Sequence, residues 1–180
     1  MKLRPQKDTI LYGDCRNTIP TIHERVQMCV TSPPYYGLRD YGGESSQIGQ
    51  EQTPEEYIEE LVKVFREVKN VLADNGTLWL NIGDSYYNYR PGKGQSYPKQ
   101  TVSKTKQDLP DKCNKRGNKL DGLKEKDLIG IPWLLAFALR KDGWYLRQDI
   151  IWHKPNPMPE SVKDRCTKAH EYIFLFSKNK

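Results

Sequence analysis

The residue types best suited to chemistry lie in the run TSPPYY, residues 31–36. It directly follows the apolar segment 26–31, and in open α/β sheets ligands bind at the carboxyl ends of strands. Two consecutive prolines restrict the backbone, so they hold the Ser32 hydroxyl, the Pro33 carbonyl and the Tyr35 ring in a rigid row. Ser-Pro-Pro also occurs in ordinary turns, which is the alternative interpretation.

A second candidate is the basic, polar segment at about residues 86–125. It nearly lacks aliphatic side chains, so it cannot bury enough surface to offset the entropy of ordering, and we expect a mobile insertion. It either contacts a phosphate backbone or is a solvated linker. The cations that we single out for a phosphate contact are Lys104, Lys106, Lys115 and Arg116. Its PGKGQS run lacks the spacing and the following helix of a phosphate loop.

The cysteines argue against metal binding. Cys15, Cys29, Cys113 and Cys166 form no Cys-x-x-Cys pair, and no His lies three to five residues from another His. A zinc site or a disulfide framework is therefore not expected, and we predict no metal and four reduced thiols.

The elements that must position the motif alternate between strand and helix patterns. Strands are predicted at residues 9–12, 26–31, 77–82, 146–152 and 172–176. A capping box at Thr53 and Glu56, with Pro54 in the first turn, starts a helix that Asn75-Gly76 should close. A second helix should open near Asp127 and end at Gly143. This order predicts an α/β fold whose sheet is mostly parallel and covered on both faces.

Length and composition set the class of protein. The chain has 180 residues and a net charge of +6, which suits one domain, residues 1–180, and slightly favours a polyanion partner. No apolar run approaches the roughly 20 residues of a membrane span, and the amino terminus has no signal-peptide core. We therefore expect no membrane association and a cytoplasmic protein.

Several segments together resemble one family. They are TSPPYYGLRDYG, the following QIGQE, GTLWLNIGDSY, the long run from KDLIGIPW to SVKDR, and KAHEYIFLFSK. In this order they resemble the site-specific DNA amino-methyltransferases that use S-adenosylmethionine, in the permuted form whose catalytic half comes first. The resemblance covers nearly all of the chain except residues 90–120. It implies a Rossmann-like sheet, S-adenosylmethionine as cofactor and double-stranded DNA as partner.

The resemblance also implies roles for the motif. Methylation of an exocyclic amine needs a nitrogen whose lone pair is turned toward an electrophilic methyl group. By resemblance, Ser32 and the Pro33 carbonyl accept hydrogen bonds from the amino hydrogens, Pro34 stiffens the row, and Tyr35 stacks on the extruded base.

Other positions follow from the same resemblance. Asp14, Thr31 and Asp84, each at the end of a predicted strand, are assigned to cofactor binding, although either aspartate could simply cap a turn. Arg39 either shapes the base pocket or pairs with Asp40. His153 and Lys154 lie in a proline-stiffened loop that resembles a family loop near the flipped base, and they join the DNA-binding set.

The chain departs from the family in one respect. No glycine-rich motif of the Phe-x-Gly-x-Gly form follows any predicted strand. The chain therefore resembles the catalytic half alone, with an incomplete sheet, and a second polypeptide could supply the other half. Serine before the two prolines favours N4 of cytosine as the target, with N6 of adenine as the alternative. A non-catalytic DNA-binding remnant is the competing function.

Overall fold

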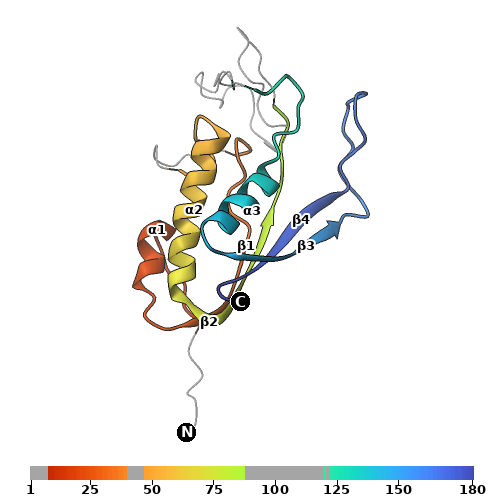
Figure 1. Ribbon diagram of the computed structural model, residues 1–180. Coiled ribbons are helices and arrows are strands. Elements are labelled where there is room, and N and C mark those ends of the chain that lie inside the picture. Colours follow the sequence, from red (N-terminus) through yellow and green to blue (C-terminus); the bar gives the residue numbers. More distant parts are fainter. Residues whose placement is uncertain (1–7, 40–46, 88–119, 121) are drawn as a thin grey trace.

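The computed structural model describes residues 8–39, 47–87, 120 and 122–180. Its elements, in chain order, are α1 (Cys15–Thr18), the 3-10 helix η1 (Ile19–Thr21), β1 (Val26–Thr31), α2 (Pro54–Val71), β2 (Leu72–Ile82), α3 (Ile131–Lys141), β3 (Tyr145–His153) and β4 (His170–Ser177) (Figure 1). Strands and helices thus share one α/β unit, which confirms the predicted class.

The four strands form one open sheet in the order β1-β2-β4-β3. β1 and β2 are parallel, whereas β4 lies between β2 and β3 and runs antiparallel to both. The prediction of a mostly parallel sheet is therefore wrong in detail. Parallel neighbours need a long crossover connection, usually a helix. The residues 154–169 that join β3 to β4 contain no helix, so the chain returns beside β3 in the opposite direction.

The longest helix, α2, starts as predicted. The Thr53 hydroxyl accepts a hydrogen bond from the Glu56 amide, and the Glu56 carboxylate accepts one from the Thr53 amide, which is a complete capping box. The predicted end is wrong. α2 stops at Val71, Leu72 is extended and fully buried, and Asn75-Gly76 lie inside β2. Burial of Leu72 in the core accompanies this early turn.

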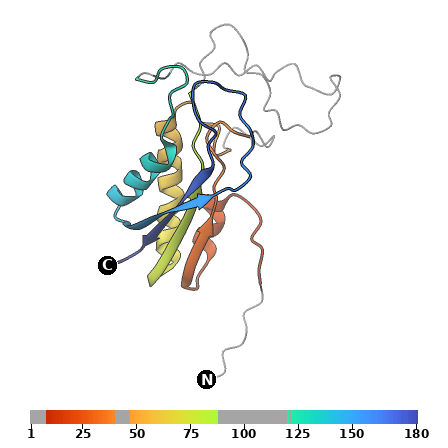
Figure 2. The same cartoon turned by 90° about the vertical axis from the view of Figure 1, so that its right-hand side faces the viewer.

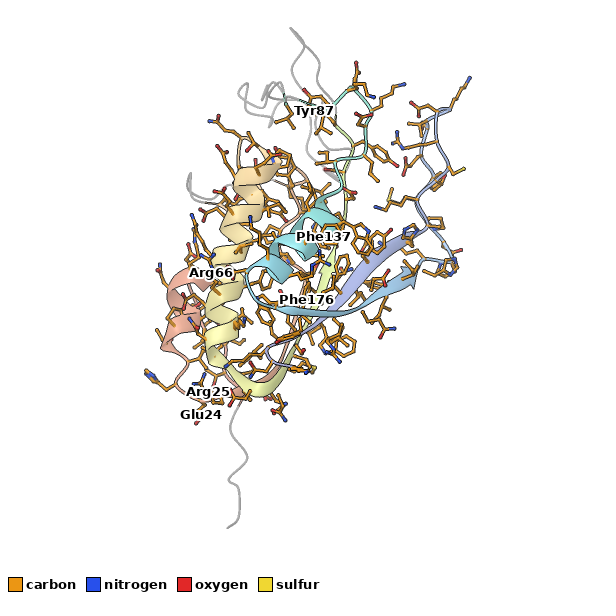
Figure 3. All side chains as sticks on the ribbon, in the orientation of Figure 1. Glu24, Arg25, Arg66, Tyr87, Phe137 and Phe176 are labelled. Carbon is orange, nitrogen blue, oxygen red and sulfur yellow. The ribbon has the colours of Figure 1, made fainter. Side chains whose placement is uncertain are left out.

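Both long helices cover the same face of the sheet (Figure 1). Leu80 of β2 and Phe174 of β4 are fully buried under them, and Phe176 lies between the sheet and the helices in Figure 3. The opposite face carries the alternate residues of each strand, since side chains alternate along a strand. There Met28 and Val30 are 52% and 69% exposed. Within the described residues no helix covers this second face, as the view in Figure 2 also shows.

The segment 9–12 is not a strand, contrary to prediction. It pairs with none of the described strands, and Ile10 and Tyr12 are 76% and 86% exposed. A strand requires a hydrogen-bonded neighbour. Apolar residue types alone therefore gave the wrong prediction for this segment.

Three further observations concern the described part of the chain. No helix in it combines the length and the apolar character that a membrane span requires. No three His, Cys, Asp or Glu side chains in it gather in a way that could hold a metal ion. Cys15, Cys29 and Cys166 are free thiols, and Cys113 lies outside the described residues.

Candidate active site

The TSPPYY motif lies where strand ends meet. β1, β2 and β3 point the same way, so their carboxyl ends share an edge of the sheet with the amino end of β4. Figure 3 shows this edge near Tyr87, which follows β2, and at the other end of the molecule Arg25, which precedes β1. Thr31 ends β1, so Ser32 projects from this edge, as the sequence predicts.

The backbone of the motif is held from two sides. The hydroxyl of Tyr57, a fully buried residue of α2, donates a hydrogen bond of 2.7 Å to the Pro34 carbonyl. On the other side the Gly37 amide donates to the Gly49 carbonyl at 2.8 Å. Gly49 has a φ of +95°, and a Cβ there would lie 3.0 Å from the Tyr35 carbonyl. The QIGQE segment therefore packs against the motif through a position suited to glycine.

The Tyr35 ring lies against the backbone of Gly83, directly after β2. A Cβ added to Gly83 would lie 2.5 Å from Cε2 of the ring. No side chain larger than a hydrogen fits there while the ring keeps its position. Burial raises the pKa of Tyr35, and the neighbouring Glu171 carboxylate raises it too, so the hydroxyl stays protonated near neutral pH and can donate a hydrogen bond.

Four side chains from three elements form one hydrogen-bonded network. The Ser32 Oγ lies 3.3 Å from both the Tyr35 Oη and the Asn81 Oδ1. The Tyr35 Oη lies 3.0 Å from the Asn81 Oδ1 and 3.3 Å from the Glu171 Oε2. The sequence analysis missed Asn81, Gly83 and Glu171. The only signals are a polar residue in the apolar run TLWLNI and a carboxylate at the start of the last strand.

The two aspartates assigned to cofactor binding make local contacts. Asp14 caps α1 by accepting from the Arg16 amide at 2.9 Å, and its carboxylate forms an ion pair of 2.5 Å with the Arg16 guanidinium. The hydrogen bonds from Arg16 lower the pKa of Asp14. Asp84 accepts from the amides of Gly130 and Ile131 at 3.0 and 3.1 Å, the first amides of α3. Both contacts match the capping alternative.

Replacing Asp84 with alanine should destabilise the protein by about 1 kcal/mol, because two amides at the start of α3 lose their acceptor. Chemical denaturation monitored by circular dichroism measures the difference. Asp74, which is exposed near the start of β2 and caps no helix, provides the control Asp74→Ala, for which we expect a change below about 0.5 kcal/mol. Equal stability of Asp84→Ala and the wild type would show that the cap contributes nothing.

The predicted DNA-binding residues are only partly described. The Arg39 side chain is exposed, and its carbonyl accepts from the side-chain amides of Gln47 and Gln50. His153 is exposed at the end of β3. Lys154 forms an ion pair with Glu171 and also lies 5.7 Å from the Trp152 ring centroid. Asp40 and the cations Lys104, Lys106, Lys115 and Arg116 lie outside the described residues.

The loop after β3 is fastened to the segment after β2. The Arg165 guanidinium stacks 3.7 Å from the Tyr86 ring centroid, and Lys126 pairs with Asp164 at 2.7 Å. Beside these contacts lies a cavity of about 510 Å³ lined in part by Tyr86, Lys126 and Arg165. Its lining includes neither Ser32 nor Tyr35, so it is separate from the motif's network.

The motif and its surroundings match a known family. The family model described as "DNA methylase" matches residues 26–180. M.SmaI, a type II methyltransferase of Serratia marcescens, is 51% identical over 95% of this chain and 56% of its own length. M.XycI, a type II methyltransferase of Xanthomonas campestris pv. cyanopsidis, is 48% identical over 98% of this chain and 58% of its own. The chain thus spans somewhat more than half the length of these relatives.

Solved structures share the fold. A DNA modification methylase of Thermus thermophilus, complexed with S-adenosyl-L-methionine, superposes with a TM-score of 0.58 and 22% identity over 93% of this chain and 52% of its own. The cytosine-N4-specific PvuII DNA methyltransferase gives a TM-score of 0.58 with 16% identity over 92% of this chain and 47% of its own. Together with the family match, these comparisons confirm the predicted resemblance, and the chain belongs to the DNA methylase family.

Proposed function

We propose that this chain is the catalytic half of an S-adenosylmethionine-dependent methyltransferase that modifies an exocyclic amine of a base in double-stranded DNA. The observation that carries the proposal is the placement of the Ser32 hydroxyl and the Tyr35 ring at the shared strand edge, held by Asn81, Gly83 and Glu171. The names of relatives that are about half identical over most of the chain support the same activity.

The residues of the chain bind and orient the base. Tyr35 offers a stacking surface to a base turned out of the helix, which offsets part of the few kcal/mol lost on extrusion. The Ser32 oxygen and the Pro33 carbonyl accept the two amino hydrogens and turn the nitrogen lone pair toward the methyl donor. The donor supplies an electrophilic methyl group. The nitrogen gains the methyl and then releases one proton.

The residues present fit the cofactor only in part. Asp14 and Asp84 already bind Arg16 and the start of α3, which leaves Thr31 of the three predicted residues. The chain has no glycine-rich motif. We therefore infer that the remainder of the binding site comes from a further segment or a second polypeptide, as the greater length of the relatives allows. The permuted order of the two halves stays a prediction.

The isolated chain of 180 residues should accordingly bind S-adenosylmethionine weakly or not at all. Isothermal calorimetry on the purified chain measures this, and the same titration after addition of the missing half should give tight binding. Micromolar affinity of the chain alone would contradict the division of the site.

The proposed target is the N4 amine of cytosine, with N6 of adenine as the alternative. Ser32 before the two prolines is the basis of the choice, because a neutral acceptor suits the electron-poor cytosine amine. The similarity to the cytosine-N4-specific enzyme, at 16% identity, bears on the fold only. Mass spectrometry of nucleosides from methylated DNA should reveal N4-methylcytosine. Methyladenine alone would favour the alternative.

A DNA-binding remnant without catalysis is the second candidate. The absent glycine motif and the engaged carboxylates of Asp14 and Asp84 favour it. It predicts that supplying the missing half restores no methylation while DNA affinity persists.

The basic insertion should contribute to DNA affinity through phosphate contacts. Neutralising Lys104, Lys106, Lys115 and Arg116 together should flatten the slope of log affinity against log salt by up to about 0.9 per lost duplex contact. Fluorescence anisotropy at several salt concentrations measures the slope. A variant with four neutralised lysines on α2 and α3 and at the carboxyl terminus (Lys63, Lys69, Lys141 and Lys180) controls for net charge. An unchanged slope in the insertion variant identifies the insertion as a linker.

A further inference from the structure

A carboxylate outside the sequence motif contacts the motif directly. Glu171, near the amino end of β4, has a side chain only 20% exposed. Its Oε2 accepts hydrogen bonds from the Tyr35 hydroxyl and the Asn81 side-chain amide, each at 3.3 Å. Its Oε1 pairs with the Lys154 ammonium. Glu171 therefore joins the motif after β1, the end of β2 and the loop after β3.

The orientation of the Asn81 amide follows from its partners. Its Nδ2 lies 3.3 Å from the Glu171 Oε2 and 3.1 Å from the Tyr172 carbonyl oxygen. Both of these oxygens can only accept when Glu171 is ionised, so the NH₂ group must face them. The amide oxygen then faces the hydroxyls of Ser32 and Tyr35, at 3.3 and 3.0 Å.

This orientation decides what Ser32 can offer a substrate. A serine hydroxyl has one hydrogen to donate and two lone pairs to accept with. The Asn81 oxygen, an acceptor, takes the hydrogen and leaves the lone pairs of Ser32 for the amino hydrogens of a base. A flipped amide would donate its NH₂ to Ser32 and occupy one of these lone pairs.

We propose that Glu171 is a positioning residue that fixes the orientation of the Asn81 amide and thereby keeps Ser32 a hydrogen-bond acceptor, and that Lys154 keeps this carboxylate charged and in place. The inference deepens the proposed function, on which its catalytic consequence rests. Lys154 is then a partner of Glu171 rather than, as predicted from the sequence, a DNA contact.

The charge state of Glu171 supports the proposal. Partial burial pushes its pKa upward, but the hydrogen bonds from Lys154 and Asn81, together with the positive charge of Lys154, outweigh this and lower the pKa below its usual range. The carboxylate is therefore ionised near neutral pH and remains an acceptor for both neighbours.

The catalytic test compares two glutamate-to-glutamine substitutions in the complete, methylating protein. Glu171→Gln can present NH₂ to Asn81 and should lower kcat by about 10- to 100-fold, the range seen when an outer hydrogen-bond partner is lost, while the KM for DNA changes less than about 3-fold. Glu160→Gln is the matched control, because Glu160 is also in an ion pair, with Arg165 at 2.8 Å, outside the network. It should behave as the wild type.

A double variant separates positioning from general structural damage. If Glu171 acts through Ser32, Glu171→Gln should reduce turnover by less than about 3-fold in a Ser32→Ala background, because coupled residues are not additive. An undiminished loss in that background, or equal activity of the Glu171→Gln and Glu160→Gln variants, overturns the proposal.

A second measurement needs no activity. In the ¹⁵N-labelled chain, the side-chain amide resonances of Asn81 should shift, and their protection from hydrogen exchange should fall, in Glu171→Gln but not in Glu160→Gln. Unchanged Asn81 resonances overturn the inference whether or not the protein methylates DNA. A wild-type protein that methylates no DNA while these resonances respond as expected contradicts the proposed function alone.

Discussion

Ser32→Ala should reduce the turnover of the complete enzyme by about 10²-fold or more, with little change in DNA affinity. Removing one preorganised polar group at a reacting centre has effects of this size. Ser32 is exposed at the strand edge and contacts only Tyr35 and Asn81 through its side chain in the described structure, so its loss should leave folding intact. Single-turnover methylation of a DNA duplex containing the target sequence measures the rate.

Ser177→Ala is the matched control for this substitution. The Ser177 hydroxyl donates to the Asn179 carbonyl at 2.7 Å near the opposite end of β4. The control removes a hydrogen-bonded serine hydroxyl from the same sheet without touching the motif, and it should keep near wild-type turnover. Full activity in Ser32→Ala would show that its hydroxyl has no role in the methyl transfer.

Gly83→Ala should lower turnover by a similar factor without a change at any group that touches the base. The added methyl would lie 2.5 Å from the Tyr35 ring, so the ring must move and its hydroxyl must leave Asn81 and Glu171. A misplacement of about 1 Å can cost roughly 10²-fold in rate. Methylation kinetics measure the loss, and the fluorescence of a 2-aminopurine target base reports whether the base still stacks on Tyr35.

Gly37→Ala provides the comparison for Gly83→Ala. Gly37 also adjoins the motif, but a Cβ there meets no atom within 4 Å. Its positive φ of 63° gives the substitution a backbone cost of roughly 1 kcal/mol without a steric clash. We expect a modest loss of stability and little loss of turnover. Turnover in Gly83→Ala within about 3-fold of the wild type would contradict the requirement for this ring position.

The sequence by itself determined the local features of this protein. The capping box at Thr53, the strand at 26–31 and the position of Ser32 at a strand end depend on residues close together in the chain, and the structure agrees with each. The family resemblance could also be seen in the sequence, because its motifs are short and contiguous. Where the prediction used residue types alone, as at residues 9–12, it failed, because a strand depends on a partner.

Only the tertiary structure decided how distant residues meet. The sequence pattern does not reveal that β4 inserts between β2 and β3, and this insertion brings Glu171 within 3.3 Å of the Tyr35 hydroxyl, 136 positions away. It also does not reveal that Asp84 caps α3 or that Lys154 turns to Glu171. Such contacts follow from strand order and direction, which depend on non-local pairing and core burial, whereas propensity and periodicity act over a few residues.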